Sequence, residues 1–149
     1  MEHGSGSPQA LLRQGVAWLK TRQKILVENL ADSMAMQKEL PEHRLPSFIR
    51  KLVAKDMIQD LIKRLDENTF DAESARKKMV SALKKGATLQ SISMTMDLML
   101  TVISTEVNRE LAASPAIRDI LLNKAHYFTT LLKSTLATAA IENEKSKMS

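Results

Sequence analysis

The chain has 149 residues, about one domain, which is enough to bury roughly two-thirds of the surface exposed when it is unfolded. It contains no cysteine, which excludes disulfides and thiolate metal sites and agrees with a reducing compartment. Apolar residues make up 44 % of the chain, but no run approaches the length that spans a bilayer. We therefore expect a cytoplasmic protein without a membrane-spanning segment.

Charged residues of both signs are interleaved along the chain. There are 22 Lys and Arg residues and 17 Asp and Glu residues, which gives a net charge of +5. Proteins that bind nucleic acid or acidic membranes gather their basic residues on one arm or face. Here opposite charges recur at helical spacing, as in Glu73 and Lys77. We interpret these charges as solvated helix faces and expect neither a nucleic-acid nor a membrane partner.

The first third of the chain predicts a short leader and one long helix. Residues 1–7 end in alternating glycine and serine, which is typical of an expression leader with nothing to pack. Ser7 and Pro8 suit a helix start, and one apolar stripe continues from there to about Gln37. The members of this stripe are Leu12, Val16, Leu19, Leu26, Leu30 and Met34. The prolines that follow end the helix, because each lacks an amide proton.

The middle of the chain predicts a helix over 47–65 and then two helices joined at a glycine. Asp71 can cap the first turn of a charged helix, and Gly86 stands where a residue with positive φ is usually needed just past the last turn. Thr88 can cap the next helix, which runs to Leu111 and carries only one charge before residue 104. We expect this apolar segment to be the central buried helix.

The last helix is predicted to start at Ser114-Pro115 and to stay apolar to about residue 141. Residues 142–149 are polar but contain neither glycine nor proline, so they are either a frayed terminus or the start of a linker helix. No segment has the pattern of a strand. The sequence therefore predicts a single all-α domain of five to six helices over residues 8–141.

No recognised catalytic or metal-ligand motif is present, and we expect a protein that is not an enzyme. Outside the leader the histidines are His43 and His126, and neither belongs to a metal-ligand pattern. His126 is interpreted as a satisfied or exposed histidine. Glu106 and Glu110 share a helix face beside Arg109, which favours an exposed, weakly repelling pair over a catalytic one.

The nine methionines allow two interpretations. Most of them coincide with the apolar stripes, which favours a role as core filler. The alternative is that the run from Met94 to Met99 lines a cavity for a small ligand or forms a helix interface. The five aromatic residues offer little surface for stacking bases or planar cofactors.

The segment from Ala82 to Ser93 has the small and branched apolar residues of a helix-turn-helix at their usual offsets. A DNA-binding regulator is therefore an alternative function. However, a recognition helix needs long polar side chains that reach base edges, and after Gln90 this helix offers Ser91, Ser93 and Thr95 among methionine and leucine. This composition argues against DNA binding.

The order of signals resembles the N-terminal sensor domains of the RsbR family of stressosome proteins, which look like globins that lack haem. The resemblance depends on Trp18 in a long first helix, on the run Ala82-Leu-Lys-Lys-Gly86-Ala-Thr-Leu-Gln-Ser-Ile92, and on a last helix that leads towards a linker. It implies a non-catalytic, globin-like sensor or interaction domain. In related haem-bearing globin-coupled sensors a proximal histidine precedes the corresponding glycine by four residues, and Ala82 occupies that place here.

The resemblance thus implies no haem, although a haem-binding gas sensor that uses His126 or a methionine is an alternative. Family members carry a C-terminal STAS domain that builds the stressosome core and binds a switch kinase, and their N-terminal domains pair as dimers. It follows that other stressosome proteins would bind through a part not present in these residues, and that the signal would be relayed through the last helix. An unknown small ligand is a further possible partner.

We also expect a homodimer from helix length. Helices of about thirty residues are about 45 Å long, against a globule of about 30 Å, so apolar turns at their ends must overhang. A second copy would bury them. The candidate interface residues are Leu11, Trp18, Leu136 and Ile141.

Overall fold

The computed structural model describes residues 6–148, which form six α-helices and the 3-10 helix η2, with no strand among them. The prediction of an all-α domain of five to six helices is confirmed. Residues 1–5 of the predicted leader lie outside the described range, and Ser7 caps the first helix. The helices are α1 (Pro8–Thr21), α2 (Gln23–Met36), η2 (Pro41–Arg44), α3 (Ser47–Glu67), α4 (Ala72–Lys84), α5 (Leu89–Glu110) and α6 (Pro115–Met148).

Three predicted helix starts have the expected capping bonds. Ser7 Oγ accepts from the Ala10 amide at 3.1 Å, and Asp71 Oδ1 accepts from the Ser74 amide at 3.0 Å. Thr88 and Ser91 form a reciprocal box, in which each side chain accepts from the other's backbone amide.

The predicted corner between α4 and α5 is also present. Gly86 has φ of +109°, a conformation that strains any residue with a Cβ atom. The chain therefore turns at this glycine, and the two helices are not one continuous rod.

The prediction of one helix over residues 8–37 is wrong. The chain breaks at Arg22, which has φ of −101° and ψ of 4°, so that α1 ends at Thr21 and α2 begins at Gln23. The Thr21 hydroxyl donates to the Trp18 carbonyl at 2.6 Å, a local bond that competes with the helical pattern. The apolar stripe continues across the break because both pieces face the same core, where Leu19 and Leu26 are fully buried.

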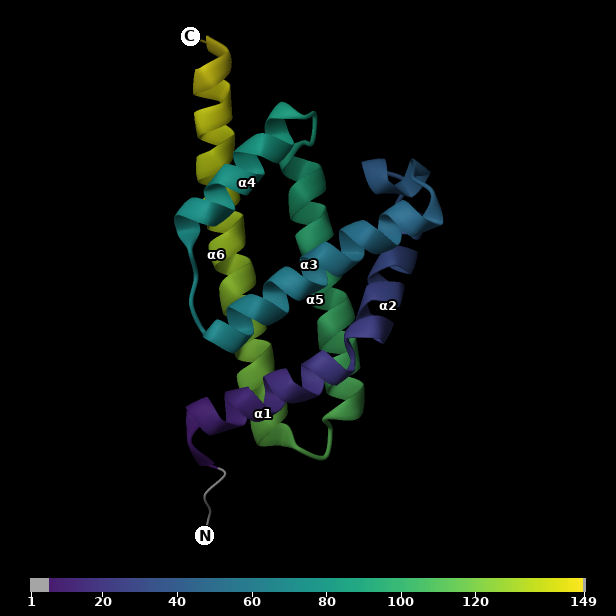
Figure 1. Cartoon of the computed structure of the whole chain (residues 1–149), viewed down its shortest axis with the longest axis vertical. Coiled ribbons are helices and arrows are strands. Elements are labelled where there is room, and N and C mark those ends of the chain that lie inside the picture. The colour runs from purple at the N-terminus through teal and green to yellow at the C-terminus, as the bar shows by residue number, and fades with distance from the viewer. Residues whose placement is uncertain (1–5, 149) are drawn as a thin grey trace.

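The central helix is α6, and not the segment 88–111 as predicted. α6 packs against α1, α3, α4 and α5, whereas α5 packs mainly against α2 and α6. Both helices also have a solvent-exposed face, which on α5 includes Leu89 and Asp97, and the Asp97 carboxylate pairs with Lys133. Figure 1 shows α1 and α3 lying across α5 and α6, α4 crossing α6 near its far end, and the last turns of α6 projecting beyond the other helices. Because α6 contacts four other helices, a change in its position would alter its packing against each of them.

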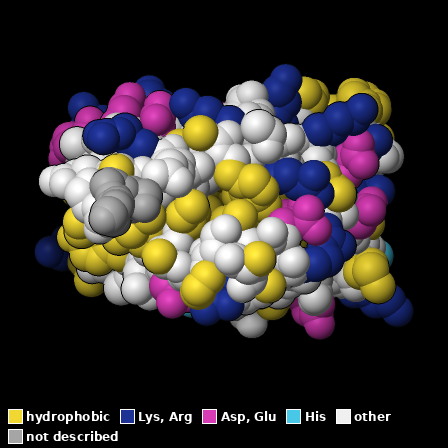
Figure 2. Space-filling view, turned by 90° about the horizontal axis from the view of Figure 1, so that it is seen from below, with side chains coloured by type: hydrophobic (Ala, Val, Ile, Leu, Met, Phe, Trp, Pro, Cys, Tyr) yellow, Lys and Arg dark blue, Asp and Glu magenta, His cyan; other side chains and the backbone are white. Residues whose placement is uncertain are grey.

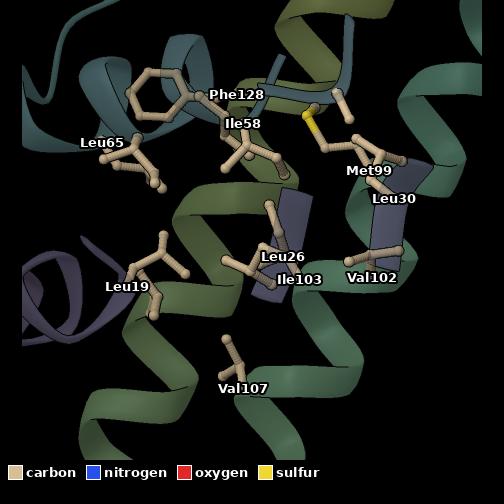
Figure 3. Packing of buried hydrophobic residues seen from close by; sticks show 14 of the residues in the cluster. Leu19, Leu26, Leu30, Ile58, Leu65, Met99, Val102, Ile103, Val107 and Phe128 are labelled. Atoms are coloured by element: carbon tan, nitrogen blue, oxygen red, sulfur yellow. The ribbon is translucent and has the colours of Figure 1, made fainter. Parts of the chain in front are cut away.

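The core has two parts. The larger joins α1, α2, α3, α5 and α6, and Figure 3 shows its side chains meeting between these helices, including Leu19, Leu26, Ile58, Ile103 and Phe128. The smaller part joins α4 to α6, with one methionine from α5. Its buried members are Ala75, Met79, Val80, Leu83, Met96, Leu132, Leu136 and Ala139. The α4 helix therefore has a packing partner of its own, separate from the larger core.

The prediction that Glu106 is exposed is wrong. Only 2 % of its side chain is accessible, because it lies under the break between α1 and α2. Its Oε2 atom accepts from Arg22 Nε at 2.7 Å and lies 2.5 Å from Arg22 Nη2, while Arg109 binds its other oxygen. Glu110 stays partly exposed at the edge of this cluster, with Oε1 3.9 Å from Arg22 Nη2. The cluster fastens the α1–α2 break to the C-terminal end of α5.

The exposed charges agree with the interleaving seen in the sequence. Figure 2 shows the face seen from below, where basic and acidic side chains lie among one another and apolar side chains are exposed between them. No helix in residues 6–148 has both the length and the apolar character that crossing a membrane would require.

Candidate functional site

A mainly apolar cleft of about 310 Å³ lies between α3, α4 and α5, and Leu132 of α6 contributes to its wall. This volume is at the lower end of the range typical of small-molecule sites. The apolar lining consists of Val53, Met57, Leu61, Ala75, Met79, Ala82, Ile92, Met96, Met99 and Leu132. We take this cleft as the candidate functional site.

The cleft exists because α4 packs on α6 and not closely on α3. The α4 residues that face the cleft include two alanines, Ala75 and Ala82, whose methyl groups leave the gap towards α3 unfilled. Met96 belongs to the smaller core, whereas Leu61 and Met99 belong to the larger one. The cleft thus lies between the two parts of the core, and anything that fills it would join them.

Four methionines line the cleft: Met57, Met79, Met96 and Met99. Met96, Met99 and Met79 are also buried in the core, so the two roles considered from the sequence coincide in these residues. Met94 is half-buried against the larger core and does not line the cleft. Flexible thioether side chains adapt to ligands of varied shape, so this lining suits an apolar guest.

Asp60, Arg64 and Lys78 form a charged cluster at one wall. Arg64 Nε donates to Asp60 Oδ2 at 3.0 Å, and Lys78 Nζ lies 3.8 Å from Asp60 Oδ1. The Arg64 guanidinium also lies over the Phe70 ring, 5.0 Å from its centroid. Both cations of the lining therefore share one carboxylate, and one of them is held further by an aromatic ring.

The Glu42 side chain reaches the cleft from η2, outside the long helices. Burial raises the pKa of its carboxyl above the usual value of 4.5, and a hydrogen bond with its own backbone amide only partly opposes this. Glu42 is the one charged lining residue for which no ion pair is found among residues 6–148. It is half-buried and has no positive partner in the described part of the chain.

The remaining polar lining residue is Thr95, which is buried. Its hydroxyl donates to the Ser91 carbonyl at 2.8 Å, so only the oxygen lone pairs remain for a ligand. Ser91 and Thr95 are two of the three small polar side chains that the helix-turn-helix alternative would direct towards DNA. Both are buried inside the protein, whereas Ser93 is half-buried and Gln90 is exposed.

The predicted interface residues are in different environments. Leu136 is 1 % exposed and lies in the smaller core, so its assignment to a dimer interface is wrong: α4 already covers it. Leu11 and Trp18 are half-buried, and Trp18 packs against the larger core. Ile141 is 59 % exposed and is the member of the set that a partner can reach.

The haem-related residues are also separated. Ala82 lines the cleft, at the place where the resemblance puts a proximal histidine in haem-bearing relatives. His126 is exposed on α6 and is not part of the lining. In the described part of the chain, no three histidine or acidic side chains come together as a metal-binding group.

Sequence reasoning missed Glu42 and the Asp60 cluster as parts of a site. Asp60 and Arg64 have the spacing of an ordinary surface pair, and Glu42 stands in a proline-containing connection with no periodic pattern. Comparison with protein-family models, with curated proteins and with solved structures finds no match. The function is therefore inferred from the cleft and from the elements that touch it.

Proposed function

We propose that this chain is a non-catalytic regulatory domain of the RsbR stressosome type, a cytoplasmic homodimer that responds to a small apolar ligand and relays the signal through α6. The observation that carries this proposal is that α4 forms one wall of the cleft and at the same time packs on the C-terminal half of α6. In this proposal the ligand contacts the face of α4 that lines the cleft, and the opposite face of α4 changes its contact with α6.

The contact between α4 and α6 is both apolar and charged. Met79, Val80 and Leu83 pack in the same cluster as Leu132 and Leu136. At the far end, Arg76 Nη1 donates to Glu142 Oε1 at 2.5 Å, next to the last turns of α6. A ligand can shift this contact only if it binds two arrangements of α4 with different affinity, and a cleft between separate parts of the core offers that difference.

The non-haem form of the proposal is supported by Ala82. A methyl group cannot ligate iron, and His126 is on a different surface from the cleft. The rival is a haem sensor that uses one of the lining methionines. An absorbance spectrum of protein produced with a haem supply tests this directly: we expect no stoichiometric Soret band, and a band at one haem per chain would overturn the non-haem proposal.

The relay can be tested by filling the cleft without a ligand. Ala82→Leu adds a side chain that points into the cleft, and Ala72→Leu makes the same change at an exposed position of the same helix. We expect Ala82→Leu to change the amide hydrogen exchange of residues 132–144 in α6, and Ala72→Leu to leave it unchanged. Equal exchange in the wild type and both variants would contradict the relay.

Dimerisation is proposed through the exposed face of α6. This helix has 34 residues and is thus about 51 Å long, so its end projects from the fold (Figure 1). Tyr127 and Ile141 are 54 % and 59 % exposed and stand about four turns apart on one side of it. Light scattering at tens of micromolar should return about twice the chain mass of 16.7 kDa, and Ile141→Glu should lower it. A wild-type value near 17 kDa would contradict the dimer.

A further inference from the structure

The four charged residues that line the cleft are not equivalent. Asp60, Arg64 and Lys78 neutralise one another in part, and they also line a polar pocket of about 160 Å³ on the other side of the α3–α4 gap. The other residues that line this outer pocket are Lys63, Glu67, Thr69, Asp71 and Ser74. The cluster therefore forms the wall between the cleft and a polar surface, and its charges have partners without any ligand.

Glu42 differs because it lines only the cleft and not the outer pocket. An ionised carboxylate that has lost water without gaining a cation raises the free energy of the empty site. A ligand that supplies a positive group beside Glu42 removes this cost. A ligand that supplies an anion faces Glu42 unfavourably and must compete with Asp60 for Arg64 and Lys78.

The size of the cleft indicates the rest of the ligand. Val53 and Arg64 both line it and are eleven residues apart on α3, which corresponds to about 16 Å along the helix. The wall between them is aliphatic and methionine-rich, and the lining contains no aromatic ring. This shape fits an extended, flexible hydrocarbon better than a planar ring system.

We propose that the cleft binds an alkylamine, an elongated aliphatic molecule whose protonated amine pairs with the Glu42 carboxylate. This inference depends on the proposed function only in using the same cleft, and it names the chemical class of the ligand. The aliphatic chain lies along α3 between Met57 and Met99 and joins α4 to the larger core.

The test compares three probes of equal chain length, n-octylamine, n-octanol and octanoate, by isothermal titration calorimetry at pH 7. We expect octylamine to bind at least about tenfold more tightly than octanol, the effect of one charge-assisted hydrogen bond, and octanoate to bind most weakly. Glu42→Gln should remove the preference for octylamine over octanol. Glu39→Gln, a control at an exposed residue outside the cleft, should keep it.

Ala82→Leu tests whether the probes bind in the cleft. If both do, this variant should lower the affinity for octylamine and for octanol to the same extent. Three results would overturn the proposal: octanoate binding most tightly, an unchanged octylamine preference in Glu42→Gln, or no binding of octylamine to the wild type. None of these bears on the ligand-free hydrogen exchange of Ala82→Leu, which tests the relay itself. The two proposals therefore fail separately.

Discussion

The buried carboxylate of Glu106 allows a direct test of how the α1–α2 break is held. Glu106→Gln keeps the size of the side chain but removes its charge. In the wild type, Oε2 of Glu106 accepts a hydrogen bond from Arg22 Nε at 2.7 Å and lies 2.5 Å from Arg22 Nη2. The substitution replaces the carboxylate with a neutral amide, so the ion pair is lost and the Arg22 guanidinium keeps only the more distant, partly exposed Glu110 as a counter-charge.

The magnitude follows from the exposure of the two partners. Breaking a fully buried ion pair costs about 3–5 kcal/mol, because the remaining charge is left without a partner. Here the Arg22 side chain is 30 % exposed and can regain water, so we expect a loss of about 2 kcal/mol. For a domain of this size that lowers Tm by about 4–8 °C.

The assay is thermal and urea unfolding of Glu106→Gln beside Glu110→Gln, the same substitution one helical turn later. Glu110 is 39 % exposed, and its Oε1 is as far as 3.9 Å from Arg22 Nη2, so removing its charge should cost less than about 0.5 kcal/mol of stability. The urea midpoint of Glu106→Gln should fall at constant m-value. If Glu106→Gln melts within 1 °C of the wild type, or no lower than Glu110→Gln, the cluster does not stabilise the break.

Three further predictions concern single positions. Gly86→Val should cost about 1–3 kcal/mol in thermal unfolding, and since nothing lies within 4 Å of an added Cβ, this cost is backbone strain alone; an unchanged Tm would exclude the corner. Thr88→Ala should cost about 1 kcal/mol through loss of the cap, whereas a stabilised variant would mean that Thr88 is inside a helix. Glu42→Gln should raise Tm at pH 7, because burial raises the carboxyl pKa in the folded state; the gain should vanish as the pH falls below the ordinary value of 4.5, and a gain independent of pH would contradict this origin.

The features predicted correctly from the sequence are local ones. The caps at Ser7, Asp71 and Thr88 and the corner at Gly86 depend on residues within three or four positions of one another, and the side-chain chemistry alone selects them. The helix stripes were correct for the same reason, since a periodic pattern needs no knowledge of what covers it.

The errors have a different origin, because they depend on contacts between distant parts of the chain. The break at Arg22 is held by a contact with Glu106, 84 residues later. The same contact buries Glu106, so the two errors have one cause. Leu136 looked available to a partner because its position in an apolar stripe does not show that α4 covers it. Tertiary packing decides these points, and one sequence does not display it.

The cleft could not be predicted for a related reason. Its lining residues belong to the same apolar stripes as the core, and only the distance between α3 and α4 separates a cleft from a packed interface. Ala75 and Ala82 are the sequence feature that opens it, but alanine on a helix face is equally typical of close packing. Glu42 became part of the site only because η2 brings it there.

The position of α4 in the chain gives the proposed relay a physical basis. It stands between two residues with left-handed backbone, Asn68 with φ of 51° and Gly86 with φ of 109°, so both ends of the segment that carries α4 are turns. Next to the first turn, Phe70 stacks on Phe128 of α6 with ring centroids 6.4 Å apart. Because its apolar contacts are mainly with α6, α4 can loosen at a lower free energy than the larger core. In the proposed relay, a ligand that joins α4 to α3 raises that free energy and thereby changes the contact between α4 and the last turns of α6.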